Sequence, residues 1–213
     1  MSMLLRRRLL AGSSPAQPVL PDDYQRLEYL ESDGTQILTT TPGDHKLNQD
    51  SRVWIRFAKT GSVTDGPQLF GCRRNTSANG FYGQISAAGR IYVGYAGGSM
   101  STGVDAELNR IYDLDFNKNT VSLDGVLKNT TTYETFTTPA NGRLFGIRGN
   151  TSTALYCGSL RVYRYKEWAD GTLIADLYPA RRLSDDVLGM YDIVNNRFAT
   201  NQGTGTFIAG PDV

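Results

Sequence analysis

The amino-acid sequence predicts an all-β fold, a sandwich of two antiparallel sheets, from three observations. Gly (23 of 213 residues) and Tyr (12) are frequent, and Thr and Asn recur in clusters, a mixture typical of short strands joined by turns. Apolar and polar residues alternate over many short segments. An amphipathic helix is conceivable only at residues 105–110. We therefore predict one sandwich domain over residues 22–213 and an extended N-terminal arm at 1–21.

The strands follow one another at short spacing along the chain. The clearest single strand lies at 53–57, where Val53, Ile55 and Phe57 alternate with Trp54 and Arg56. Turn-forming clusters of Gly, Asn and Ser separate the segments. The expected strands are 24–30, 35–40, 53–57, 69–72, 80–85, 90–95, 111–116, 120–123, 144–147, 155–165, 172–178, 187–193 and 198–200, with a last one at 206–209.

A hairpin is predicted at 111–123, with its turn at Asn117-Lys118-Asn119. The period of two places Tyr112, Leu114 and Phe116 on one face of the first strand, and Asp113 and Asp115 on the other. We interpret the acidic side as a solvated face, because it lies beside a turn on a polar strand face.

Composition excludes several classes of protein. The net charge of +1 argues against electrostatic binding of nucleic acid, and no stretch approaches the ~20 apolar residues of a membrane span. The start resembles a signal peptide, but only Leu9, Leu10 and Ala11 follow its arginines, so we expect it to be retained. Cys72 and Cys157 are interpreted as buried thiols in preference to a disulfide bridge.

Three segments carry a resemblance to a known superfamily. They are residues 24–36 (YQRLEYLESDGTQ), the hairpin end at 122–125 (SLDG), and the C-terminal run with YPARR at 178–182 and GMYD at 189–192. Together they resemble concanavalin A-like lectin/glucanase modules of the laminin-G-like type, found in gut bacteria and their phages. The resemblance spans about residues 24–210 and implies a jelly roll of two packed antiparallel sheets, with a surface or virion role in many members.

Glucanases of this fold class use a Glu-x-Asp-x-Glu strand, which places three carboxylates on one sheet face. No such triplet occurs, and the nearest pair is Asp113 and Asp115. Residues 113–124 partly imitate a calcium loop, but Lys118 stands where that loop needs Gly. His45, the one histidine, is interpreted as a surface residue. We predict no catalytic residues, no enzyme activity and no metal ligands, and leave calcium binding by loop carboxylates open.

Aromatic side chains in the predicted strands are candidates for binding glycans, since sugar rings stack on aromatic rings. Trp54 is expected to point away from the core, and Tyr163 and Tyr165 to oppose Leu160 and Val162. Packing under a loop or against a subunit is the alternative for such rings. The candidates are Trp54, Tyr82, Tyr92, Tyr95, Tyr163 and Tyr165.

The N-terminal arm carries leucines on both sides of three arginines. We predict that it docks into a groove of a larger assembly, and the alternative is a disordered tail. The residues expected to anchor it are Leu4, Leu5, Arg6, Arg7, Arg8, Leu9 and Leu10.

These features lead to a functional prediction. We expect a phage virion structural protein, such as a capsid decoration, head-fibre or tail-associated module, assembled in the bacterial cytoplasm. Its expected partners are other virion proteins, host or mucosal glycans and further copies of itself. The alternatives are a bacterial surface or free carbohydrate-binding module and a glycoside hydrolase, the latter disfavoured by the missing carboxylate triplet.

Overall fold

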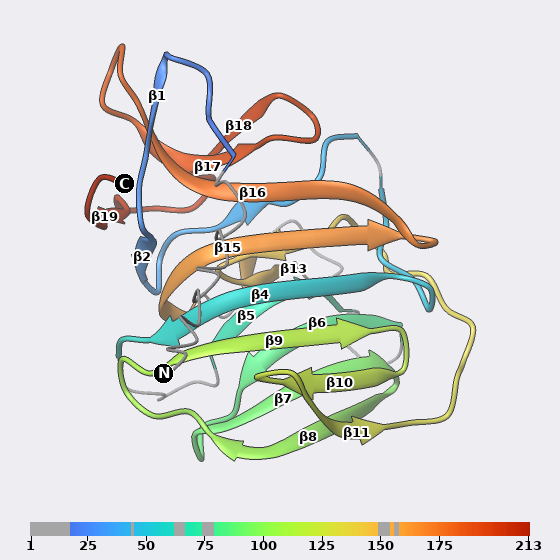
Figure 1. The fold of residues 1–213 in the computed structure, drawn as a ribbon. Helices are drawn as coiled ribbons and strands as arrows, with labels where there is room; N and C mark the ends of the chain where they lie inside the picture. Colours follow the sequence, from blue (N-terminus) through green and yellow to red (C-terminus); the bar gives the residue numbers. More distant parts are fainter. Residues whose placement is uncertain (1–17, 44, 62–66, 74–78, 149–153, 156–157) are drawn as a thin grey trace, which may run out of the picture.

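A computed structural model describes residues 18–43, 45–61, 67–73, 79–148, 154–155 and 158–213. Within these residues every regular element is a β-strand, and the strands form two sheets packed face to face (Figure 1). The predicted all-β, two-sheet sandwich is confirmed. Nowhere in these ranges is there a helix long and apolar enough to cross a membrane.

The larger sheet contains eleven strands within the described residues. Eight of them are neighbours in one series, and three short strands pair outside this series: β1 with β16, and β2 with both β15 and β19. The series runs β11 (Val126–Thr130), β10 (Thr120–Leu123), β9 (Ile111–Asn117), β4 (Arg52–Lys59), β15 (Ser159–Ala169), β16 (Thr172–Arg182), β17 (Leu188–Asp192) and β18 (Arg197–Thr200). The three others are β1 (Tyr24–Arg26), β2 (Leu30–Asp33) and β19 (Ile208–Ala209).

The smaller sheet contains eight strands within the same ranges. Its pairings are antiparallel except for the parallel contact of β13 with β5. The strands are β14 (Ala154–Leu155), β13 (Ile147–Arg148), β5 (Gln68–Cys72), β6 (Gly80–Ile85), β7 (Arg90–Ala96) and β8 (Gly98–Asp105), with β12 (Arg143–Leu144) joining β5 to β3 (Leu38–Thr39).

The core lies between the sheets and is built from alternate residues of each strand. Tyr112, Leu114 and Phe116 of β9 are fully buried, as their alternation predicts. Phe116 stacks on Phe81 of the opposite sheet, with ring centroids 4.0 Å apart and ring planes 16° apart. These rings connect the two layers directly and bury their apolar surface between the sheets.

A second, smaller apolar cluster lies on the outer face of the large sheet. Leu20 is buried against Tyr178 and Tyr191, and Tyr24 packs on Tyr191 with ring centroids 4.6 Å apart. Among the described residues, Leu20 is the first with a buried side chain. This cluster holds the N-terminal segment against the sheet.

The sequence misses two strands, β8 and β11, and suggests a helix at 105–110 that does not form. The Gly, Ser and Thr residues of β8 are typical of turns, yet β8 is fixed by its ladder with β7. Residues 106–110 instead connect β8 to β9, and Asn109 adopts a left-handed φ of 59°, which ends any helical turn.

Candidate functional site

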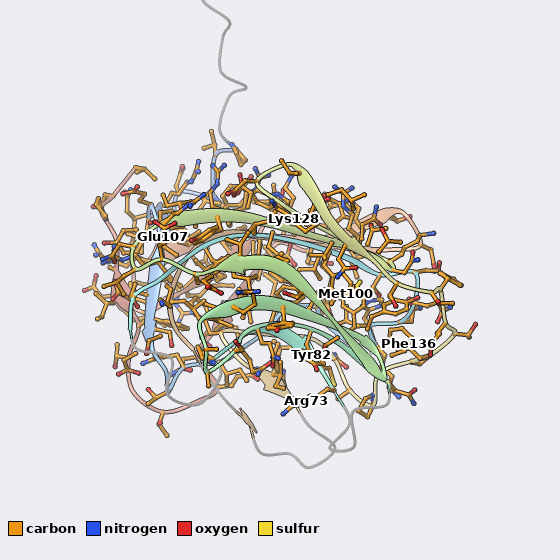
Figure 2. The ribbon with its side chains drawn as sticks, turned by 90° about the horizontal axis from the view of Figure 1, so that it is seen from below. Arg73, Tyr82, Met100, Glu107, Lys128 and Phe136 are labelled. Atoms are coloured by element: carbon orange, nitrogen blue, oxygen red, sulfur yellow. The ribbon has the colours of Figure 1, made fainter. Side chains whose placement is uncertain are left out.

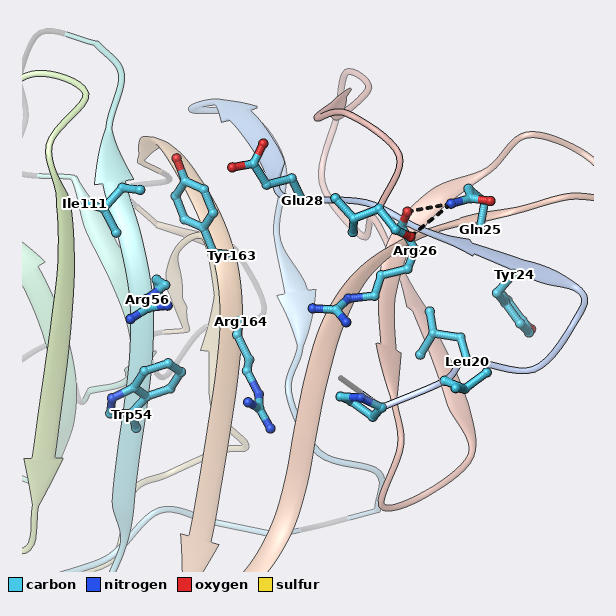
Figure 3. A pocket seen from close by; sticks show the side chains of 13 residues that line it. Leu20, Tyr24, Gln25, Arg26, Glu28, Trp54, Arg56, Ile111, Tyr163 and Arg164 are labelled. Carbon is cyan, nitrogen blue, oxygen red and sulfur yellow. Dashed lines mark hydrogen bonds between the residues drawn. The ribbon is translucent and has the colours of Figure 1, made fainter. Parts of the chain in front are cut away.

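A groove of about 860 Å³ lies on the outer face of the large sheet, over β4 and β15 (Figure 3). The segment leading into β1 closes one side, and Val213 lies beside it because its backbone N–H donates to the Arg26 carbonyl over 3.1 Å. The lining residues are Pro18, Val19, Leu20, Tyr24, Gln25, Arg26, Glu28, Trp54, Arg56, Ile111, Tyr163, Arg164 and Val213.

Two aromatic side chains reach this groove from adjacent strands. Trp54 points outward because Val53 and Ile55, its neighbours in β4, fill the core. Tyr163 lies at a β-bulge in β15, where the register with β4 shifts between Val162 and Arg164. The extra residue of a bulge re-aims side chains, and here Tyr163 and Arg164 both line the groove.

Each of two arginines in the groove is held by an aspartate through a bidentate pair. Arg56 donates from Nε and Nη2 to the two carboxylate oxygens of Asp113 over 2.8 and 2.7 Å. Arg164 donates in the same way to Asp176, also over 2.8 and 2.7 Å. Such pairs fix the plane of the guanidinium group, and the hydrogen bond that Arg56 donates to Asp113 raises the pKa of Arg56 above its ordinary value.

Aromatic rings lie against three arginines of the groove, Arg26, Arg56 and Arg164. The Arg56 guanidinium lies 5.8 Å from the Trp54 ring centroid, and Arg164 and Arg26 lie 4.4 and 4.9 Å from that of Tyr178. Burial raises the pKa of Tyr178 to about 12 and also raises that of Tyr163. The phenols of Tyr163 and Tyr178 therefore keep their protons at neutral pH. The groove itself presents arginine N–H groups, the phenols of Tyr24 and Tyr163, and one carboxylate side chain, Glu28.

The structure divides the six predicted aromatic candidates among three places. Trp54 and Tyr163 both line the groove. Tyr95 and Tyr165 are buried in the core, so neither can offer a ring face to a ligand. The expectation that Tyr165 shares the outer face with Tyr163 is wrong, because the bulge reverses the alternation of β15 and turns Tyr165 inward.

Tyr82 and Tyr92 lie on the outer face of the smaller sheet. The Tyr82 ring covers Gly94, since a Cβ atom there would lie 2.1 Å from a ring carbon, and the Arg73 guanidinium lies 5.5 Å from its centroid (Figure 2). Tyr82 is only 8% exposed. Tyr92 stands opposite Gln84 and Ser101 in the register of that sheet and is half-buried.

Other predicted positions lie outside the described residues. These include Cys157 and the anchoring residues 4–10, so docking by the arm remains a prediction from sequence. Cys72 is buried in β5, as expected.

Sequence reasoning did not single out Arg56, Arg164 and Arg26 as site residues. For Arg56 the sequence does carry a signal. Arg52 and Arg56 lie on one face of a predicted strand, and Asp113 and Asp115 lie on one face of another, which suggests complementary faces. Only the register, which sets Arg56 opposite Asp113 and Arg52 beside Asp115, turns that complementarity into specific pairs. The acidic hairpin face is thus ion-paired as well as partly solvated.

His45 is not the simple surface residue that its polar loop suggested. Its Nε2 atom is buried and lies 3.6 Å from Oε1 of Glu167, a fully buried carboxylate. The other oxygen of Glu167 accepts a hydrogen bond from Tyr165 over 2.7 Å. Desolvation raises the pKa of Glu167, so this cluster is a proton-sensitive point inside the fold.

The acidic residues that could suggest a metal site are placed apart from one another or are used within the fold. Among the described residues, no group of three or more His, Cys, Asp or Glu side chains gathers in a way that could hold a metal ion. Asp124, the last position of the calcium-like segment, instead accepts a hydrogen bond from the backbone N–H of Asp113 over 2.9 Å.

The chain is similar to a solved structure from Bacteroides ovatus ATCC 8483, a protein provisionally described as carbohydrate binding. The TM-score is 0.57 at 11% sequence identity, and the match covers 87% of this chain. This chain spans 60% of the length of that neighbour. A likeness at this identity shows the common fold alone. No family model matches the sequence, and no curated protein sequence matches it significantly.

Proposed function

We propose that this chain is a non-enzymatic carbohydrate-binding module of the concanavalin A-like, laminin-G-like type, and that its glycan binds in the groove over β4 and β15. The observation that carries the proposal is the joint placement of Trp54 and Tyr163 beside arginines whose planes are fixed by carboxylates. The structural neighbour described as carbohydrate binding supports the same class of ligand.

The groove offers the two kinds of contact that a sugar ring needs. The C–H faces of a sugar ring pack on aromatic rings, which Trp54 and Tyr163 provide. The hydroxyl groups of the sugar need hydrogen-bond donors and acceptors around the edge of the ring. Arg56 and Arg164 supply N–H donors, and Glu28 supplies an acceptor. Because the arginines are already held in place, a ligand would lose less free energy in ordering them.

We infer binding without turnover from the state of the nearby carboxylates. Glycoside hydrolysis needs one carboxyl group to hold a proton for the leaving group and a second to act as nucleophile or base. Asp113 and Asp176 each accept hydrogen bonds from an arginine on both carboxylate oxygens, so both groups are already engaged within the protein. Glu28 alone cannot fill both roles.

Replacing Trp54 by alanine is expected to weaken glycan binding about tenfold, because the ring supplies the stacking surface and supports Arg56. A glycan array would identify a ligand, and titration calorimetry with that ligand would measure the loss. Trp168→Ala is the matched control, since Trp168 lies under Arg52 at 4.6 Å and does not line the groove. Equal losses in both variants, or none in Trp54→Ala, would contradict the assignment of the groove.

The finer part of the proposal, attachment to a phage virion, rests on the resemblance of the sequence to modules found in gut bacteria and their phages and on the sequence of the arm. A truncated chain that lacks the arm tests this attachment. The truncation should end at residue 17, because Leu20 packs in the cluster with Tyr178 and the loss of Leu20 would disturb the sheet. We expect the chain without residues 1–17 to fold and to stay at the top of a gradient in which the full chain sediments with particles. Co-sedimentation of the shortened chain would refute anchoring by Leu4–Leu10.

A further inference from the structure

We infer that the groove selects uncharged sugars over uronic acids or other anionic glycans, an inference that rests on the proposed function. Arginines in a binding site usually suggest an anionic ligand, since the guanidinium fork matches carboxylate geometry. In this groove, Arg56 and Arg164 already form such pairs with aspartates of the protein itself. The N–H groups outside these pairs suit the hydroxyl groups of a neutral sugar.

The positive charges of the groove are closely balanced by acidic side chains. Arg56 and Arg164 have carboxylate partners at 2.7 Å in Asp113 and Asp176. Glu28 adds a third negative charge against Arg26, and Lys166, just outside the lining, shares Asp176 at 3.9 Å. An incoming carboxylate would therefore meet nearly as much repulsion as attraction.

The register explains why the aspartates are needed. Arg56 of β4 and Arg164 of β15 stand directly opposite each other, and like charges in that position destabilise a sheet. Asp113 of β9, the strand on the other side of β4, neutralises Arg56. Asp176 of β16, the strand on the other side of β15, neutralises Arg164. The balance is thus built into four successive strands.

The same geometry leaves donors free for a neutral ligand. Asp113 and Asp176 occupy the Nε and Nη2 edge of each guanidinium, so the N–H groups on Nη1 take no part in these pairs. A sugar hydroxyl can accept from such a donor without displacing the aspartate. A ligand carboxylate could not form a bidentate pair on the Nε/Nη2 edge, which is occupied.

Glu28 adds a preference of its own. Figure 3 shows its carboxylate at the same end of the groove as the Tyr163 ring. A carboxylate accepts hydrogen bonds readily from sugar hydroxyls but repels a uronate. The Tyr163 end of the groove, one of the two places where a sugar ring could stack, therefore also disfavours negative charge.

The test compares matched neutral and uronate polymers, methyl-esterified with unesterified polygalacturonate and β-1,4-mannan with β-1,4-polymannuronate, by calorimetry with the full chain. We expect the wild type to bind the neutral member of the responsive pair at least about threefold more tightly. Asp113→Asn should shift the ratio toward the uronate by about threefold, because Arg56 then carries an uncompensated charge.

Asp115→Asn is the matched control, since Asp115 forms the same bidentate pair with Arg52 on the same strand but outside the groove lining. Its ratio should equal that of the wild type. Asp176→Asn gives a second variant if Asp113→Asn unfolds. A wild type that prefers the uronate, or an unchanged ratio in both groove variants, would overturn the inference. Absence of binding to every neutral and anionic glycan tried would instead refute the proposed function.

Discussion

Replacing Phe116 by alanine should lower the free energy of unfolding by about 3–5 kcal/mol, the usual cost of truncating a buried phenylalanine. Phe116 is fully buried, stacks on Phe81 at 4.0 Å and meets Tyr95 edge-on at 6.3 Å. Removal of the ring leaves a cavity at the contact between the sheets, and the close-packed neighbours cannot move to fill it. Since domains are stable by only ~5–15 kcal/mol, this single change removes a large share of the total.

The loss should appear in urea unfolding as a lower midpoint with an unchanged slope, and in thermal unfolding as a melting temperature roughly 10 °C lower. Leu127→Ala on β11 is the control, because that side chain is 61% exposed and should change stability by less than about 0.5 kcal/mol. Phe116→Leu should fall between the two. A Phe116→Ala protein as stable as the control would show that the sheets do not depend on this contact.

The sequence was informative where alternation is unbroken. Val53, Ile55 and Phe57 fixed the inward face of β4, and with it the outward position of Trp54. The faces of the β9 hairpin followed in the same way, including the outward Asp113. These predictions held because a half-buried strand with period two leaves only one register that buries its apolar residues.

Prediction failed at the bulge in β15, where one extra residue reverses the pattern. Tyr165 and Glu167 turn inward, and Arg164 and Trp168 turn outward, although Leu160 and Val162 suggest the opposite. A bulge depends on pairing with a distant strand, here β4, so a single sequence carries no local signal for it. The pairing of Arg164 with Asp176 and the depth of the groove depend on that same shift.

The inward turn of Glu167 leads to the second large effect. Glu167→Gln should raise the free energy of unfolding by about 1–3 kcal/mol at neutral pH, because a neutral side chain of the same shape replaces a buried carboxylate. The amide oxygen can still accept the Tyr165 hydroxyl, which now donates over 2.7 Å. What disappears is the desolvation cost of the charged form.

The pH dependence follows from the direction of the pKa shift. Burial raises the pKa of Glu167 above its ordinary value of 4.5, with smaller opposing effects from Tyr165 and His45 and a further increase from the charge of Asp192. Below the ordinary value the carboxyl is protonated in both the folded and unfolded states, and its full contribution to stability is present. As the pH rises through the raised pKa of the folded state, the unfolded chain ionises freely and that stability is lost.

Urea unfolding of wild type and Glu167→Gln between pH 4 and 8 would measure the difference directly. The free energies of unfolding of the two proteins should be nearly equal at pH 4, and that of the variant should exceed that of the wild type increasingly as the pH rises. Ion pairs that both proteins share do not contribute to this difference. The Nε2 atom of His45 lies 3.6 Å from Oε1 of Glu167, so the same comparison in a His45→Asn background isolates the contribution of His45. A difference that does not change with pH, or a variant less stable at neutral pH, would mean that His45 and Tyr165 compensate the buried charge in full, and that the cluster stabilises the fold as an ion pair.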